Sequence, residues 1–483
     1  MFLFKNHSYD SFFDDINGKK LDKYQRKVIL DESQNLLVVA GAGSGKTLTI
    51  LGKVKYLIEK KGYSEREILC LSFTNETVNN LKNKLDYSVD VLTFHKLGLS
   101  ILQKSNFKYS ISSDTLLEYV TDEYFYSFVN KNDLESYFEN KYLYEEILNS
   151  DELIVLKRNI LSFIKKIKCN DLKIKDLERI KRKCFRIQDK LFLLFSLSIF
   201  SIYQEELLST LKIDFDDMII YAKDLVSKIH FPYRYIIIDE YQDISFVRFS
   251  LIFEILQKTN AKLMCVGDDY QAIYGFSGSS VSLFINFFKY FQKAKRIDIK
   301  NTYRNSYELI KTSVNFIKKN PCQLKKDIHA TFLYKNPIVL VYYDNNYLEM
   351  YQNVLNYLYL EDEKEVMVLA RYNKDLDEVR EKNTKGIIIR YLTCHMAKGL
   401  ESDNVILLKM SDDYLGFPSK IKNNEIIEMI DNDWENIDYA EERRLFYVAL
   451  TRCRKRIYIL VPKHNPSSFI EEIKNDCAIL LLK

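Results

Sequence analysis

The sequence predicts an α/β protein built on parallel β-sheets, with an all-helical segment inserted between the strands. Short apolar runs that alternate with amphipathic, helix-length segments favour parallel sheets covered by helices. From about residue 99 to 212 the pattern changes to long helices with almost no Gly or Pro. With 483 residues, 47% of them hydrophobic, the chain is long enough for roughly two to four domains.

The first strand is expected at residues 35–40 (NLLVVA), which lead into a Gly-rich turn and then an apolar-periodic helix. Further strands of the buried, parallel type are expected at 68–73, 235–239, 262–268, 364–370 and 404–410. Charge divides the helical segment: residues 114–146 have nine acidic and two basic side chains, and residues 157–190 have thirteen basic and four acidic ones. The basic run is either a solvated helix face or a surface for phosphates.

Composition excludes few classes of function. No apolar run approaches the ~18 residues of a membrane span, and the first fifteen residues lack the order of a signal peptide. We therefore expect a cytoplasmic protein without a membrane partner. The eight cysteines are scattered, without the spacing of zinc or iron–sulfur ligands. A net charge of +4 neither supports nor excludes a polyanionic partner.

The turn after the first strand is a Walker A loop. Its glycines let backbone N–H groups surround phosphates at a helix N-terminus, while the lysine neutralises the β/γ oxygens and the threonine holds Mg²⁺. The predicted residues are Ala40, Gly41, Ala42, Gly43, Ser44, Gly45, Lys46 and Thr47. Ala40 departs from the pattern, which has glycine there. This loop alone allows a kinase, a GTPase or any ATPase.

A second half of the nucleotide site follows the strand at 235–239, where YIIIDEYQD places two acids at the carboxyl end of the strand. Open α/β sheets put their chemistry at this edge. Asp239 is expected to ligate Mg²⁺, and Glu240 to orient and deprotonate the attacking water.

The DExxQD form of this motif, followed by VGDDYQAIYGFSG (266–278), resembles the UvrD/Rep/PcrA type of superfamily 1 helicases. Other segments resemble the remaining motifs in the same order: LDKYQ (21–25), LSFTN (71–75), VLTFHKLG (91–98), IDFDDMI (213–219), NTYRN (301–305), VLARYN (368–373), LTCHMAKGLESDNVIL (392–407), GFPS (416–419) and EERRLFYVALTR (441–452). The resemblance implies two RecA-like motor domains in tandem. The expected boundaries are 1–98 with 213–295 for the first, 99–212 for its helical insertion and 296–483 for the second.

The resemblance also implies that ATP and Mg²⁺ bind between the two motor domains. Arg304 and Arg452 match the arginine fingers that stabilise transition-state charge, an effect of about 10³–10⁵ in rate; the alternative for each is a structural ion pair. Gln271 is similar to the sensor of the γ-phosphate. The nucleoside contacts implied are Gln25 and Tyr303 for the adenine and Glu401 for the ribose.

Binding a single strand without reading its sequence requires aromatic platforms and phosphate donors. The positions that match the DNA-contacting motifs are Phe73, Thr74, Asn75, His95, Tyr274, Phe276, Thr393, His395 and Lys398. With 14% aromatic residues, a single aromatic is more often part of the core. Tyr274 and Phe276 are stronger candidates, because alternate residues of a Gly-rich loop project together. The two histidines have no further ligands for a metal, so a phosphate or base contact is expected.

The chain departs from the family at several places. Ser277 stands where many relatives have arginine, and Ser402 where they have a large apolar residue. Full-length relatives insert a subdomain called 2B between the motifs at Arg304 and Thr393, but only about ninety residues separate these motifs here. We therefore expect a compact form without 2B. After Arg452 we expect one strand and a short helix, and no nuclease domain.

The leading hypothesis is an ATP-driven translocase and helicase on single-stranded or partial-duplex DNA, with 3′→5′ polarity and the preference for DNA over RNA implied by the resemblance. A second hypothesis is a regulatory ATPase, the motor subunit of a nuclease, DNA-repair or antiviral defence complex of the Gabija type, with weak unwinding of its own. A third, a nucleic-acid-binding module with a dead ATP site, is disfavoured because no catalytic position is missing.

Overall fold

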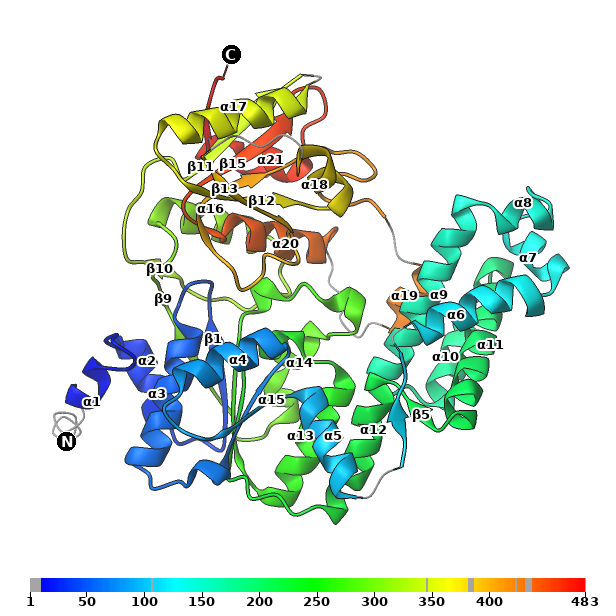
Figure 1. Ribbon diagram of the computed structural model, residues 1–483, viewed down its shortest axis with the longest axis horizontal. Helices are drawn as coiled ribbons and strands as arrows, with labels where there is room; N and C mark the ends of the chain where they lie inside the picture. The colour runs from blue at the N-terminus through cyan, green and yellow to red at the C-terminus, as the bar shows by residue number, and fades with distance from the viewer. Residues whose placement is uncertain are drawn as a thin grey trace.

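The computed structural model describes residues 10–105, 108–113, 115–344, 346–380, 386–421, 424–430 and 437–482. Residues 1–9, which belong to the segment tested for a signal peptide, lie outside this set. Two parallel β-sheets of six strands each lie one above the other, and a cluster of helices lies beside the first (Figure 1). The predicted α/β class is confirmed.

The first sheet has the strand order β3-β2-β6-β7-β1-β8. Its strands are β1 (Asn35–Ala40), β2 (Ile68–Ser72), β3 (Asp90–Thr93), β6 (Tyr235–Ile238), β7 (Lys262–Gly267) and β8 (Lys295–Ile299). Leu37 and Val39 of β1 pack into one core, and Leu36, Val38 and Ala40 into another on the opposite face. Both faces are therefore covered, as the continuous apolar strands require. The covering helices include α3 (Lys46–Glu59), α4 (Asn75–Lys84), α5 (Phe94–Lys104), α12 (Phe215–Leu225) and α13 (Phe246–Thr259).

The second sheet has the order β13-β12-β14-β15-β11-β16. Its strands are β11 (Ile338–Tyr343), β12 (Glu365–Ala370), β13 (Ile388–Thr393), β14 (Ser402–Leu407), β15 (Cys453–Pro462) and β16 (Ala478–Ile479). Separate cores again cover its faces, with α16 (Tyr307–Ile317), α17 (Tyr347–Leu360), α18 (Asn373–Arg380), α20 (Ala440–Leu450) and α21 (Ser468–Ile473) around it. A two-stranded ribbon, β9 (Asn301–Thr302) and β10 (His329–Ala330), lies between the sheets.

The structure moves two of the expected domain boundaries, the one at residue 295 and the one at residue 99. Strand β8 pairs with β1, Leu36 opposite Lys295 and Ala40 opposite Ile299, so the first sheet extends past residue 295. Helix α5 packs on α12 in the core of the first sheet, so the helical insertion begins after it. A short pair of strands, β4 (Ser110–Ile111) and β5 (Lys212–Ile213), joins the two ends of the insertion.

The helical cluster comprises α6 (Leu116–Glu123), a π-helical turn (Tyr124–Phe128), α7 (Lys131–Tyr137), α8 (Tyr144–Leu148), α9 (Asp151–Cys169), α10 (Ile174–Lys183) and α11 (Ile187–Ser209). By length and hydropathy, α11 alone among the described helices could cross a membrane, so the expectation that no run approaches that length needs correction. Phe192, Phe195 and Ile199 of α11 are buried in the core of the cluster. Packing thus accounts for part of the apolar character of α11, because 44% of its most apolar stretch is buried.

One element of the cluster core comes from far along the chain. Helix α19 (Glu425–Ile430) belongs to the segment between β14 and α20, yet it lies against α9 and α10 (Figure 1). Ile426, Ile427 and Ile430 are at most 4% exposed and complete the core of the cluster. The second half of the chain therefore holds the helical cluster directly.

Candidate active site and nucleic-acid interface

The Walker A loop runs from the end of β1 to Gly45, the N-cap of α3, with Lys46 and Thr47 in the first turn. Gly43 has φ 70°, and a Cβ atom there would lie 2.8 Å from Thr302 Oγ1, so glycine is required. Thr302 Oγ1 donates to Ala42 O at 2.7 Å. The strand segment β9, which leads to the second sheet, therefore closes directly over the phosphate loop.

Lys46 forms an ion pair with Glu240, with Nζ 2.8 Å from Oε1. Glu240 adopts φ 52° and ψ 38°, a left-handed conformation that is uncommon outside glycine and concentrates at functional sites. Burial opposes its charge, but the Lys46 ammonium holds the pKa of Glu240 below its usual range. Burial, with the adjacent Glu240 charge, raises the pKa of Asp239. The two halves of the predicted nucleotide site thus meet around Lys46.

The predicted adenine contacts lie on one side of the loop. Gln25 donates from Nε2 to Ser44 O at 3.1 Å and accepts from Asp22 N at 2.9 Å. Asp22 Oδ2 accepts hydrogen bonds from Asn301 Nδ2 at 2.9 Å and from Tyr303 OH at 2.8 Å. Tyr303 is 49% exposed, so a face of its ring is open to a base. Asp22, which the sequence did not single out, ties the glutamine motif to Tyr303.

Arg304 also lies at the phosphate loop, next to Gly43. Its Nε is 2.5 Å from Glu401 Oε2, and Glu401 is also paired with Arg454 at 2.9 Å. The structural ion pair that the sequence left open for Arg304 is therefore present. A nucleotide that binds next to Gly43 would compete with Glu401 for the guanidinium, because phosphate oxygens are acceptors of the same kind.

Arg452 is 1% exposed and contacts the predicted sensor, with Nη2 donating to Gln271 Oε1 at 3.2 Å. Its other hydrogen bonds end on Val448 O, Leu400 O and Thr451 Oγ1. Among the described residues it has no carboxylate partner. Burial, together with the nearby Arg304 charge, lowers the pKa of Arg452 to about 9. A buried, uncompensated guanidinium of this kind favours an anion in the cleft.

Four of the predicted DNA-binding residues form one group. Phe276 is 55% exposed and meets the His395 ring edge-on at 5.4 Å, and Tyr274 lies 6.2 Å from Phe276. Lys398 lies over the Tyr274 ring but is only 7% exposed, because its Nζ is 2.5 Å from Asp243 Oδ2 and 2.7 Å from Gln271 O. Phe276 is open to bases, Tyr274 is half-buried beside it, and Lys398 faces the nucleotide side.

The other predicted DNA contacts lie where strands of the two sheets end. Phe73 follows β2 and packs on Phe94 at 5.0 Å, and His95 in α5 packs on Phe215 at 5.0 Å. Thr74 caps α4, which begins at Asn75, and Thr393 ends β13. Burial, with the Arg248 and Lys165 charges, lowers the pKa of His95 to about 4. These residues lie at strand ends like those of the nucleotide site.

Helix α20 connects the two sides. At its start, Glu441 Oε1 accepts from Gly275 N at 3.0 Å, which fixes the loop that carries Tyr274 and Phe276. One turn later Arg444 Nε donates to Ala272 O at 2.6 Å, and Arg452 follows the C-terminal end. The motif EERR was recognised in the sequence, but these roles for Glu441 and Arg444 were not.

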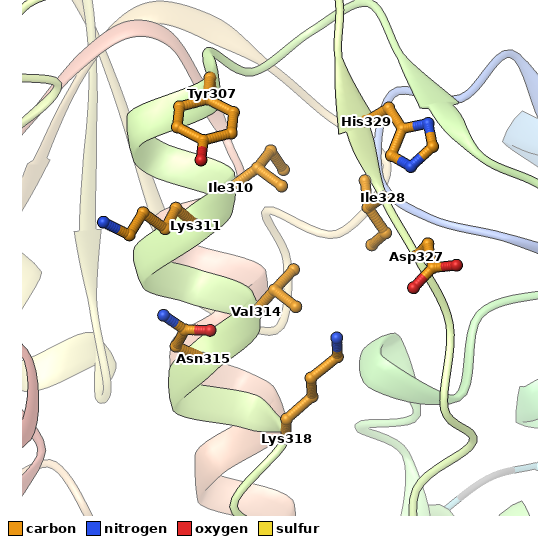
Figure 2. A pocket seen from close by; sticks show the side chains of 9 residues that line it. All are labelled: Tyr307, Ile310, Lys311, Val314, Asn315, Lys318, Asp327, Ile328 and His329. Atoms are coloured by element: carbon orange, nitrogen blue, oxygen red, sulfur yellow. The ribbon is translucent and has the colours of Figure 1, made fainter.

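A separate hollow lies beside the ribbon of β9 and β10, between α16 and β10 (Figure 2). Figure 2 shows Ile310 and Val314 of the helix facing Ile328 across it, with Lys318 and His329 beside them. None of the residues predicted for nucleotide or DNA lines this hollow. Ile328 also lies next to Gly41, so the hollow borders the phosphate loop without being part of the site.

Two parallel-sheet domains, with a Walker A loop and paired acids on the first and two arginines reaching it from the second half of the chain, define a P-loop nucleotide-binding protein with tandem RecA-like domains. Residues 21–292 match the UvrD/REP helicase N-terminal domain. The chain belongs to this family of DNA helicases.

The relatives match different shares of this chain. This chain is 30% identical to DNA helicase IV of Escherichia coli, over 97% of this chain and 72% of that protein. A probable DNA helicase of Mycoplasma pneumoniae is 24% identical over 94% of this chain and 87% of its own. A probable DNA helicase II homolog of Mycoplasma capricolum is 27% identical over 66% of this chain, which covers only 43% of that relative.

Proposed function

We propose that this protein is an ATP-driven motor that moves on single-stranded DNA in the 3′→5′ direction and unwinds DNA ahead of it. The observation that carries the proposal is α20, which holds the aromatic loop through Glu441 and Gly275 at one end and places Arg452 against Gln271 at the other. An 11-residue helix spans about 16 Å. Closure of the second sheet on a nucleotide would therefore displace the DNA-side loop.

The residues at the phosphate loop support hydrolysis. Glu240 is ionised beside Lys46 and would accept a proton from the attacking water, while Arg304 and Arg452 would neutralise the charge that develops on the γ-phosphate. Asp239 accepts only the Glu240 backbone N–H, at 2.9 Å, among the described residues, so its carboxylate fits Mg²⁺ together with Thr47. Mg²⁺, when bound, would neutralise phosphate charge.

The test is the rate of Mg²⁺-dependent ATP hydrolysis with and without single-stranded DNA. Stimulation by DNA supports the motor, and turnover that DNA does not change would refute it. Lys46→Ala should abolish turnover without loss of the fold. Lys55→Ala should leave turnover intact, because Lys55 is a half-buried lysine of the same helix whose Nζ lies 5.5 Å from the centre of the Phe12 ring. Partial duplexes with a 3′ or a 5′ tail separate the two polarities.

The finer parts of the proposal rest on family resemblance. The 3′→5′ direction and the preference for DNA are carried over from it, while the compact form without 2B is inferred from the roughly ninety residues between the motifs at Arg304 and Thr393. Among the described residues no contact favours the alternative of a subunit in a nuclease, repair or defence complex. An unwinding assay beside a translocation assay would separate the two, since the alternative expects movement along a strand with weak unwinding.

A further inference from the structure

A buried lysine outside the predicted site contacts both carboxylates of the loop that carries Gln271. Lys326 is 3% exposed, and Asp268 and Asp269 are fully buried. The Lys326 ammonium is paired with Asp268, lies 2.7 Å from Asp269 Oδ1 and sits 3.4 Å from the centre of the Tyr270 ring. Two adjacent buried carboxylates require such a cation.

The segment that delivers Lys326 is fastened to the same loop by three further hydrogen bonds. Leu324 N donates to Asp269 Oδ2 at 2.8 Å, Tyr270 OH donates to Leu324 O at 3.1 Å, and Gln323 Nε2 donates to Asp269 O at 3.2 Å. This segment joins α16 to β10 and continues into Asp327 and Ile328 beside the hollow (Figure 2). The position of Lys326 is therefore fixed by its neighbours as well as by its charge.

A chain of contacts leads from Lys326 to the arginine finger. Asp268 uses one oxygen for Lys326 and the other, Oδ2, to accept from Gln271 Nε2 at 2.6 Å. A glutamine amide has one donating and one accepting end. Because the donating end is held by Asp268, the accepting end faces Arg452 Nη2. The reverse orientation would place two donors against each other.

We propose that Lys326 is a positioning residue that holds Asp268 in place and so holds the Gln271 amide toward Arg452. The inference rests on the proposed function, because it concerns how Gln271 is oriented in the ATP site of the motor. Without the cation, one of the two buried carboxylates would take up a proton. The contact between Asp268 and Gln271 Nε2 would then be disturbed, and the amide would lose its fixed orientation.

Among the described residues, the charged or titratable side chains that interact with Asp268 or Asp269 include Lys326, the Walker A Lys46, Tyr270 and Tyr447. Lys46 is already paired with Glu240, so it does not replace Lys326. The loss of Lys326 should therefore appear in the pH profile of turnover.

The experiment compares Lys326→Met with Lys325→Met, the exposed neighbouring lysine, in DNA-stimulated ATP hydrolysis from pH 6 to 9. For Lys326→Met we expect kcat at pH 7.5 to fall about tenfold or more, as small errors in position do. The KM for ATP should stay within roughly threefold, and the acid limb of the profile should move to higher pH. Asp268→Asn should be as slow as Lys326→Met, but at every pH. Lys326→Arg should keep most of the turnover rate of the unmodified chain.

The outcomes are decisive. If Lys326→Met keeps the rate and pH profile of Lys325→Met, or loses rate and thermal stability without any change in the profile, the positioning role is refuted. If Lys326→Met does not fold, Asp268→Asn decides, because it leaves one cation beside one carboxylate; full activity would refute the role. If the unmodified chain is not stimulated by DNA, the proposed function fails, and this inference with it.

Discussion

Arg452 and Gln271 meet at the boundary between the two halves of the chain, with Nη2 donating to Oε1 at 3.2 Å. Gln271 follows β7 of the first sheet, and Arg452 follows α20 beside the second. The backbone oxygen of Gln271 also accepts from Lys398 Nζ at 2.7 Å, and Lys398 lies over the Tyr274 ring. Gln271 thus contacts Arg452 directly and is linked through Lys398 to the Tyr274 ring of the DNA-side loop.

The first prediction concerns this contact. Arg452→Ala should lower kcat for DNA-stimulated ATP hydrolysis by about 10³ or more, because a buried guanidinium would no longer neutralise transition-state charge. Arg454→Ala, two residues on and 51% exposed, should cost no more than a few-fold. Single-turnover rates at saturating ATP and DNA make the comparison, with thermal unfolding as the control for folding. Equal rates for the two variants would contradict the assignment.

The second prediction concerns the exposed aromatic ring on the DNA side. Phe276→Ala should weaken binding of single-stranded DNA by about 1–3 kcal/mol, the contribution of one stacked base. Phe288→Ala is the matched control, because that ring is 50% exposed but lies on α15 (Phe287–Tyr290), away from the site. Fluorescence anisotropy with a labelled oligonucleotide measures both. A similar affinity for the two variants would show that Phe276 does not stack on DNA.

Much of this arrangement could be predicted from the sequence, because its signals are local. The apolar runs of β1, β2, β6, β7, β12 and β14 were recognised from their pattern, and β11 (IVLVYY) was open to the same reasoning. Strand β8 (KRIDI) was missed because it is an edge strand, and its Arg296 and Asp298 side chains pair with each other at 2.6 Å. Charged residues of this kind interrupt the apolar pattern from which a strand is predicted.

The rest depends on contacts between distant segments. Lys326 is one lysine in the polar run KKD, and its burial against Asp268 and Asp269 becomes visible only when α16 and β7 are placed together. Nor does the sequence of α19 indicate that its isoleucines pack on helices more than two hundred residues earlier. The roles predicted for the site residues remain predictions, while their grouping around the phosphate loop and the aromatic loop is what the structure adds.

The third prediction concerns pH. Burial, with the Arg371 and Lys398 charges, lowers the pKa of His395 to about 4, against about 6.5 in an unfolded chain. Between these values the unfolded chain binds more protons, so stability is lost as pH falls from about 6.5 to 4. His395→Gln should therefore lose less stability than the unmodified chain between pH 7 and 5 in urea unfolding. His464→Gln changes a side chain that is 82% exposed, so it should lose as much stability as the unmodified chain. The same loss in the unmodified chain, His395→Gln and His464→Gln would contradict the prediction.

The fourth prediction concerns the docking of α19 on the helical cluster. Ile427 is 1% exposed in the cluster core, and Ile427→Asp would bury a carboxylate without a partner. Because α19 is a short helix on a long connection, we expect it to leave the cluster rather than accept that charge. Amide hydrogen exchange of α19 and of the facing parts of α9 and α10 should then become faster.

Met429→Asp supplies the control for that change, because the Met429 side chain is 38% exposed on the same helix and surface substitutions usually change stability by less than about 0.5 kcal/mol. Glu425→Gln should also have little effect, since the 2.8 Å pair with Arg186 joins side chains that are 64% and 55% exposed. The isoleucines, rather than the ion pair, would then hold the helix. Equal exchange rates in Ile427→Asp and Met429→Asp would mean that α19 does not dock on the cluster in solution.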